Sequence, residues 1–337
     1  GTLPSISNVE KINFSGYGEN KQINVSSIAG VTDVILRNQT TQGTGDSTLT
    51  VGAGQTVTLN TVQDSGNAGN ELIIASASSV TSNTVILDKA GDAGATGNDL
   101  ELEIAGTGVT TLNLQTANNA SRISLQDEAN TGDFAVSTIN VTGDKNLTID
   151  NLAASSASTV TIAAGSFTGA LDANLSATEN FAVTTGSGND RVNFGAALTT
   201  GDSVDLGAGT DTIAVSVADL SNAGLVTELK KVKNAEIVET TSANAATISG
   251  NALEGTFDTF KVSGAMAAVA TGTGAISVDA SNLANNDVIQ FSADRAGSAV
   301  AAAADNSGNT GADGVELTPL LDGSSNVATM QLLGGVD

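Results

Sequence analysis

The sequence predicts an all-β protein: an elongated stack of strand repeats of the β-solenoid, β-roll or β-sandwich-like type, with one short helix. Three observations lead to this fold class. Short runs that alternate apolar and polar residues, or are rich in β-branched residues, recur along almost the whole chain. Clusters of Gly, Asn, Asp and Ser separate these runs, and helical spacing of apolar residues is scarce. Such runs, bounded by turn residues, are typical of strands in sandwiches, barrels and solenoids.

The expected strands each carry one apolar face. We count about two dozen of them, at the spacing expected for an all-β architecture. Representative runs lie at residues 11–14, 48–51, 56–59, 100–104, 111–114 and 146–149. With 3% aromatic residues and no Trp, the core must consist of thin layers of Val, Ile, Leu and Ala.

A weak internal repeat supports stacking of these strands. An acidic residue stands just before a strand-like run at Glu10, Glu179 and Glu236, and Asp33 belongs to a looser copy. Self-similar strand units bury their apolar faces against their neighbours, which is the organisation of stacked repeats. The period is too irregular to give a coil length.

Residues 217–233 hold the best helical pattern. Their Leu and Val residues would form one apolar stripe, followed by lysines at positions 230, 231 and 233. Basic residues at the end of a helix interact favourably with its C-terminal carbonyls. The lysine cluster therefore has two interpretations, a helix-end charge or a contact with acidic surface glycan.

Composition narrows the range of functions. The 337 residues contain 36 Asp and Glu against 12 Lys and Arg, a formal net charge of −24. Such a surface repels nucleic acid and anionic lipid and attracts divalent cations. The chain has neither Cys nor His, which removes disulfides, thiolate metal sites and the commonest general base. Oxygen ligands for hard cations remain available.

An enzyme is not expected. Polysaccharide-degrading enzymes on β-solenoids need paired carboxylates with suitable partners in one groove. Glu101 and Glu103 are two residues apart and share one side of a strand, and we interpret them as a solvated face. A glycan-binding adhesin remains an alternative, although the low aromatic content offers few rings for sugar recognition.

The most specific passage lies at residues 185–215, where the order Gly-x-Gly-x-Asp-x-apolar occurs twice. Glycines permit tight turns and present carbonyls, the aspartate supplies carboxylate oxygen, and the apolar residue points into the core. Calcium-binding parallel β-rolls need residues in this order. The motif positions are Gly186, Gly188 and Asp190 in the first copy and Gly207, Gly209 and Asp211 in the second.

On this motif, and on strand–turn phrases such as residues 141–149, the chain resembles the repeats-in-toxin family. More specifically, it is similar to surface-layer proteins of Gram-negative bacteria that are exported by type I secretion, such as the Caulobacter type. The resemblance implies that both copies ligate Ca²⁺ through backbone carbonyls and aspartate side chains, with about two or three ions at a short β-roll. The first position of the full nonapeptide, usually Gly, is Thr185 in one copy and Leu206 in the other.

Asp202 and Asp205 lie between the two copies, where they could complete a site or be solvated turn acids. Further turns concentrate oxygen donors at residues 67–71, 92–99 and 305–313. For these three turns an ordinary loop and a calcium site are both open interpretations.

We expect three regions along the chain. Residues 1–175 form a β-strand repeat region, 176–240 a calcium-binding β-roll segment with the short helix, and 241–337 a β-rich C-terminal region. The Ala-rich and Gly-rich stretches at 265–274 and 299–314 are expected to be connections or long loops. The abrupt start and end suggest a fragment of a longer polypeptide.

These expectations combine into a function. The chain is expected to be a secreted, extracellular structural protein that self-assembles with calcium into a two-dimensional lattice on the bacterial cell surface. The alternative is a calcium-dependent adhesin or biofilm-matrix module. The expected partners are further copies of the chain, and surface polysaccharide or lipopolysaccharide through regions outside it. Neither a nucleic-acid partner nor a transmembrane segment is expected.

Overall fold

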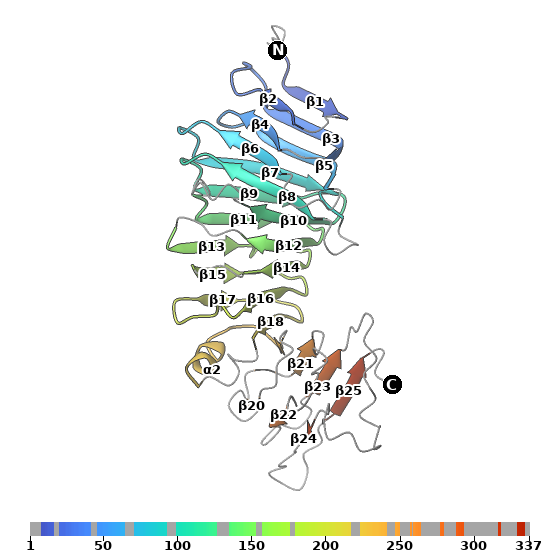
Figure 1. Ribbon diagram of the computed structural model, residues 1–337, viewed down its shortest axis with the longest axis vertical. Helices are drawn as coiled ribbons and strands as arrows, with labels where there is room; N and C mark the ends of the chain where they lie inside the picture. The colour runs from blue at the N-terminus through green and yellow to red at the C-terminus, as the bar shows by residue number, and fades with distance from the viewer. Residues whose placement is uncertain are drawn as a thin grey trace. The chain divides into compact units, whose positions relative to one another are not determined.

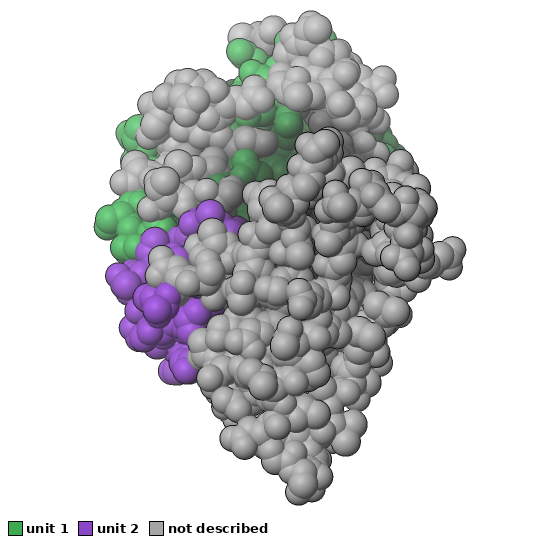
Figure 2. Space-filling model, turned by 60° about the horizontal axis from the view of Figure 1, so that its bottom comes forward, with its two compact units in different colours: residues 1–190, 207–209 green, residues 191–206, 210–337 purple. Residues whose placement is uncertain are grey.

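The computed structural model of the chain (Figure 1) describes residues 8–16, 20–41, 46–64, 71–92, 99–126, 135–152, 157–175, 179–216, 223–240, 247–249, 257, 259–263, 277–279, 288–292, 316–317 and 329–333. The chain divides into two compact units, coloured green and purple in Figure 2. Unit 1 comprises residues 1–190 and 207–209, and unit 2 comprises residues 191–206 and 210–337.

Unit 1 is a parallel β-solenoid. Its odd-numbered strands from β1 to β15 form one parallel sheet, and its even-numbered strands from β2 to β14 form another. Each coil passes once through each sheet, so strands β1 to β14 make seven coils (Figure 1). Consecutive coils stack in register, as in the pairing of Lys11 with Asp33 and of Thr56 with Thr84.

The strands of the first sheet in unit 1 are β1 (Lys11–Ser15), β3 (Asp33–Thr41), β5 (Thr56–Asp64), β7 (Ser82–Asp88), β9 (Thr111–Thr116), β11 (Thr138–Thr142), β13 (Thr159–Ala163) and β15 (Asn180–Thr184). The strands of the second sheet are β2 (Gln22–Asn24), β4 (Ser47–Val51), β6 (Leu72–Ser76), β8 (Leu100–Ala105), β10 (Ser121–Gln126), β12 (Leu147–Leu152) and β14 (Leu171–Asn174). Paired residues are 21 positions apart at Thr159 and Asn180 but 30 apart at Leu72 and Leu102. This variation explains why the sequence repeat has no fixed period.

The alternation in the sequence places one side of each strand in a thin core. Burial alternates residue by residue along β4. Leu36, Leu59 and Leu87 are paired on three consecutive coils, and each is 0% exposed. Because each coil adds one layer of aliphatic side chains, the core of unit 1 is built largely without aromatic rings.

Unit 2 contains the other strands and helix α2 (Ala223–Leu229). One sheet is parallel in the order β16, β18, β19, β21, β23 and β25, and a three-stranded sheet has the order β20, β22 and β24. The strands are β16 (Arg191–Gly195), β17 (Ser203–Asp205), β18 (Thr212–Val215), β19 (Ile237–Thr240), β20 (Thr247–Ser249), β21 (Thr259–Ser263), β22 (Ser277–Asp279), β23 (Val288–Ser292), β24 (Glu316–Leu317) and β25 (Thr329–Leu333).

The predicted fold class is confirmed: the described residues form 25 strands, a parallel solenoid and one short helix. Five of the six runs named from the sequence fall within β1, β4, β5, β8 and β9, and the sixth, 146–149, overlaps β12 from Leu147 on. Glu10, Glu179 and Glu236 each precede a strand directly, as the weak repeat indicated. The expected division of the chain at residues 175 and 240 stays a prediction.

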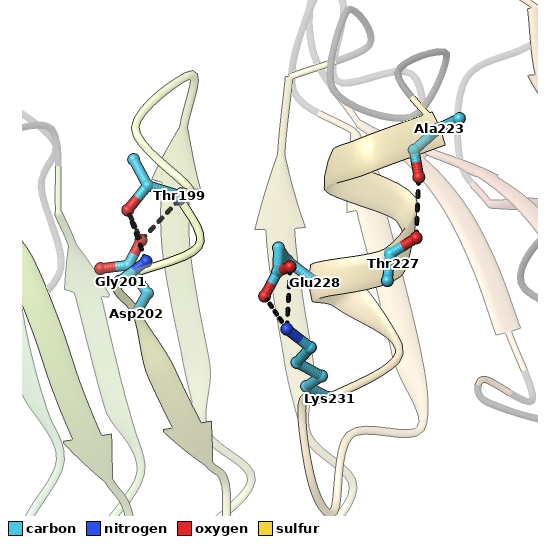
Figure 3. A network of polar contacts seen from close by, with 7 residues as sticks. All are labelled: Thr199, Gly201, Asp202, Ala223, Thr227, Glu228 and Lys231. Atoms are coloured by element: carbon cyan, nitrogen blue, oxygen red, sulfur yellow. Dashed lines mark hydrogen bonds and ion pairs between the residues drawn. The ribbon is translucent and has the colours of Figure 1, made fainter.

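Helix α2 ends before the expected end at residue 233. It ends at Leu229, so the lysines at 230, 231 and 233 follow the helix instead of forming its last turn. Lys231 binds back to Glu228, with its Nζ 2.7 Å from Oε2 (Figure 3). Residues 217–222 and the expected connections at 265–274 and 299–314 lie outside the described residues.

A cluster of polar side chains around Asp88 connects three coils of unit 1. Asp88, which is 6% exposed, accepts hydrogen bonds from Nδ2 of Asn60 (2.6 Å), Asn118 (3.0 Å) and Asn119 (2.8 Å). Burial raises the pKa of Asp88, but the amide hydrogen bonds and the charge of Arg37 outweigh burial and hold this pKa below its usual value. The ionised carboxylate therefore ties three coils together.

Replacing this carboxylate in the Asp88→Asn variant should destabilise unit 1 by about 1.5–3 kcal/mol at neutral pH, because charge-assisted hydrogen bonds lose their anion. A lowered pKa contributes stability above the unfolded-state pKa, and the contribution disappears as the pH falls through the folded-state pKa. The difference between wild type and variant in urea unfolding should thus shrink below about pH 4. A difference that stays constant into acid would contradict this role of the anion.

Candidate calcium-binding turns

The first Gly-x-Gly-x-Asp copy forms a turn that stacks on the turn of the coil before it. This turn, at residues 185–190, follows β15, and the preceding turn follows β13. Ser187 N donates a hydrogen bond to Phe167 O at 3.1 Å. The next turn repeats the contact, since Ala208 N donates to Gly186 O at 2.8 Å. Three successive turns of unit 1 are therefore in direct backbone contact.

The glycines of the motif are required by this close approach. A Cβ atom on Gly186 would lie 1.7 Å from Phe167 O, and one on Gly188 would lie 2.3 Å from a carbonyl oxygen of the preceding turn. A Cβ atom on Gly207 would lie 2.2 Å from Gly186 O. Gly207 and Gly209 also have φ values of 80° and 148°, which L-residues rarely adopt. Backbone contact therefore explains Gly186, Gly188 and Gly207, and positive φ explains Gly207 and Gly209.

Asp190 is buried where it can reach the preceding coil. It is 1% exposed, and its Oδ1 accepts a hydrogen bond from Leu171 N at 2.7 Å. Because Leu171 begins β14, the aspartate caps the start of a strand on that coil. Val192, two positions further on, is 0% exposed, as the motif predicted for its apolar residue.

Asp211 occupies the corresponding place in unit 2 and is 0% exposed. Its N–H donates to Glu236 Oε2 at 2.8 Å, and its carbonyl accepts from Glu236 N (3.1 Å) and Ile237 N (2.9 Å). The pairing of Thr212 with Ile237 aligns Asp211 with Glu236 on neighbouring coils. An acidic residue therefore precedes both β18 and β19 at the same position of the coil.

Asp202 and Asp205 have local partners in unit 2. Asp202 Oδ2 accepts hydrogen bonds from Thr199 N (2.6 Å) and Thr199 Oγ1 (3.0 Å), which closes a short turn (Figure 3). Asp205 lies in β17, and its Oδ1 accepts from Asn234 Nδ2 at 2.7 Å. These contacts match the interpretation as turn acids, and ligation by either residue stays a prediction.

The structure divides the predicted ligand residues between the two units. Unit 1 holds Gly186, Gly188, Asp190, Gly207 and Gly209, and unit 2 holds Asp202, Asp205 and Asp211. Sequence reasoning did not include Asn234 and Glu236 in the candidate site. Their signal was present in the weak repeat, where an acid precedes a strand.

The donors offered by the stacked turns of unit 1 are oxygen atoms. They are the carbonyls of Phe167 and Gly186, which face the following turn, and the buried carboxylate of Asp190. A carbonyl oxygen has two lone pairs, so Gly186 O can accept from Ala208 N and still ligate a cation. Calcium binds about six to eight such oxygens, with backbone carbonyls among them. The chemistry of these donors therefore fits calcium.

The acidic turns and the Glu101–Glu103 pair named from the sequence give no metal site in the described structure. Among the described residues, no group of three or more acidic side chains is arranged to hold a metal ion. The acidic turns at 67–71, 92–99 and 305–313 lie largely outside the described residues. Glu103 is 8% exposed, so interpreting it as part of a solvated face is wrong.

Comparison with known proteins gives no relative. Models of protein families, curated proteins and solved structures all yield no match to this chain. In the part of the chain that the structure describes, no helix is long and apolar enough to cross a membrane.

The stacking of the turns predicts that alanine substitutions at two glycines of neighbouring turns differ strongly in their effect on the free energy of unfolding. Gly186→Ala should destabilise unit 1 by at least about 3 kcal/mol in urea unfolding, because its Cβ would overlap a backbone carbonyl that cannot swing away. Gly165→Ala is the matched control, since its Cβ would meet only Thr184 Cγ2, at 3.5 Å. The control should be neutral or slightly stabilising. Equal effects of the two substitutions would contradict the stacked geometry.

Proposed function

We propose that this chain is a structural, non-enzymatic module of a bacterial surface layer, in which copies assemble with calcium into a two-dimensional lattice. The observation that carries the proposal is the stack of glycine turns in unit 1. These turns stack backbone carbonyl oxygens on successive coils, and the turn at residues 185–190 ends in the buried carboxylate of Asp190. A parallel solenoid also repeats the same two sheet surfaces coil after coil, which suits lateral association between copies.

Calcium, when bound, would neutralise the buried carboxylate and the carbonyl dipoles at the stacked turns. The residues of the chain prepare this arrangement. Glycines let the backbones meet, Asp190 caps the start of β14, and the amides of Ser187 and Ala208 hold successive turns together. A cation that binds the stacked turns better than the unfolded chain adds folding free energy.

The net charge of −24 supports a calcium-rich, extracellular setting. Without divalent cations, like charges repel and keep an unfolded acidic chain expanded and soluble. Calcium would then add to the stability of the fold and act as the switch for assembly after secretion. In this proposal the principal partner is another copy of the chain, and surface polysaccharide or lipopolysaccharide would be bound through regions outside it.

Electron microscopy of the purified chain tests this function directly. Negatively stained samples should show ordered sheets with calcium at its extracellular concentration and separate particles in chelator, because assembly depends on calcium. Compact single particles in both conditions would contradict the lattice. That result would favour the alternative, a calcium-dependent adhesin or biofilm-matrix module.

Calcium should also raise the stability of the folded chain through Asp190. At a free calcium concentration of about 100 times the dissociation constant, the wild type should gain about 2.7 kcal/mol against urea, measured relative to chelator. Asp190→Ala should lose most of this gain, because it removes the carboxylate at the stacked turns.

Asp144→Ala is the control for this measurement. Asp144 is an exposed acid whose side chain pairs with Lys145 at the surface, with Nζ 3.0 Å from Oδ2. This variant should keep the full calcium gain. A gain that survives in Asp190→Ala, or that vanishes equally in both variants, would refute a calcium site at this turn.

A further inference from the structure

We propose that an uncharged face of unit 1 binds the same face of a second copy, about a two-fold axis. The strands β5, β7, β9, β11, β13 and β15 are neighbours in the first sheet of unit 1 (Figure 1). The neutral face consists of alternate, outward-facing residues of these strands, from Thr56, Thr58 and Asn60 of β5 to Asn180, Ala182 and Thr184 of β15. The inference rests on the proposed self-assembly, because it names one contact between copies.

Charge separates the two outer surfaces of the solenoid. On the neutral face, all of whose residues the structure describes, the outward positions hold only Thr, Ser, Asn, Gln, Ile and Ala. The outward positions of the second sheet include the acids Glu101, Asp150 and Asp172 and one base, Arg122. Because the chain has a net charge of −24, two copies repel each other overall. Contact through the neutral face brings the fewest charges together.

The acid that lies beside the neutral face is enclosed. Asp88 is the next outward position on β7 after Ile86. It is 6% exposed, and asparagine amides donate hydrogen bonds to both of its carboxylate oxygens. Its charge is therefore compensated within unit 1 and is not presented to a second copy.

Amide side chains of the neutral face already bond to their neighbours. Asn140 Nδ2 donates to Asn113 Oδ1 at 2.8 Å, and Asn113 Nδ2 donates to Thr84 Oγ1 at 3.3 Å. The three residues are paired on consecutive strands, so these bonds form a ladder across the coils. A polar group that keeps a hydrogen-bond partner costs less free energy to remove from water than one that loses all of its partners. The ladder therefore lowers the cost of covering this face.

The size of the neutral face suits a weak contact. Six strands about 4.8 Å apart, with three outward positions on each about 6.6 Å apart, give a face of roughly 600 Å². Two such faces would bury roughly 1,200 Å², at the lower end of the range for specific interfaces. Short side chains such as Thr111, Thr138 and Thr161, which are paired on consecutive strands, allow two sheets to pack face to face. A two-fold contact of this kind closes after two copies and predicts reversible dimers.

Sedimentation of the full chain in chelator tests this contact without the lattice, because the neutral face has no carboxylate that needs calcium. The wild type should dimerise reversibly as its concentration rises. Thr138→Asp places a carboxylate within the face of each copy, and dimerisation should weaken at least about 100-fold because both charges would be buried without partners. Thr138→Asn has the same shape and a similarly low strand propensity without the charge, so it should dimerise within about threefold of the wild type.

Thr148→Asp is the control for added charge on another surface. Thr148 is an outward residue of β12, which forms one coil with β11 but belongs to the second sheet. This variant carries the same extra charge and should dimerise like the wild type. Urea unfolding should give equal midpoints for the two variants at position 138, which separates a lost contact from a lost fold.

A cross-linking experiment gives an independent readout. The chain has no cysteine, so Thr138→Cys introduces a single thiol within the neutral face. A short bis-maleimide should then link two copies of this variant rapidly in chelator. Thr148→Cys places the thiol on the second sheet and should stay unlinked.

The outcomes separate this contact from the lattice. A wild type that stays monomeric at every concentration in chelator would overturn the contact, as would equal dimer affinities of Thr138→Asp and Thr138→Asn. Dimers in chelator without sheets in calcium would support the contact and refute the lattice. Sheets in calcium from a chain that is monomeric in chelator would support the lattice and refute the contact.

Discussion

Direct backbone contact between successive coils is the constraint on which unit 1 depends. In the candidate calcium-binding turns, carbonyl oxygens of one coil lie where a Cβ atom of the next would be, so these positions accept only glycine. Hydrogen bonds from Ser187 N and Ala208 N then join the turns. This contact aligns the strands that follow the turns with the paired strands of the preceding coil. The close approach of successive coils therefore accounts both for the thin aliphatic layers of the core and for the position of the oxygen donors in the turns.

Acidic residues in this chain have structural as well as electrostatic roles. Asp88 accepts hydrogen bonds from asparagine amides of neighbouring coils, and Asp190 caps a strand of the preceding coil. In unit 2 the carboxylate of Glu239 lies 2.9 Å from both Arg191 Nη2 and Lys261 Nζ, and it is 2% exposed. A buried carboxylate is stable only where donors or cations surround it. The acids at the corners are therefore part of what holds coils together, and calcium would extend the same principle.

The sequence predicts the strands because the pleat of a strand imposes a period of two that is visible in each run. It also predicts the turns of the motif, since glycine order reflects local backbone needs. It does not predict that Asp190 caps Leu171, because coil length varies and pairing across coils is not local. The sequence also does not predict the φ values of Thr61 and Lys89, 55° and 59°, which are unusual for non-glycine residues. The end of the helix was placed too late because the apolar period of residues 217–233 does not mark where the helix ends.

We therefore propose that stacked turns, buried acids and bound calcium together hold the solenoid. Hydrogen exchange of the Ser187 and Ala208 amides, measured in chelator and in calcium, tests this account most directly. Both amides should exchange slowly in chelator, because they bond to carbonyls of the preceding turn, and more slowly still in calcium, because the cation holds the same turns together. Rapid exchange that calcium leaves unchanged would contradict both the stacking of the turns and their role in binding the ion.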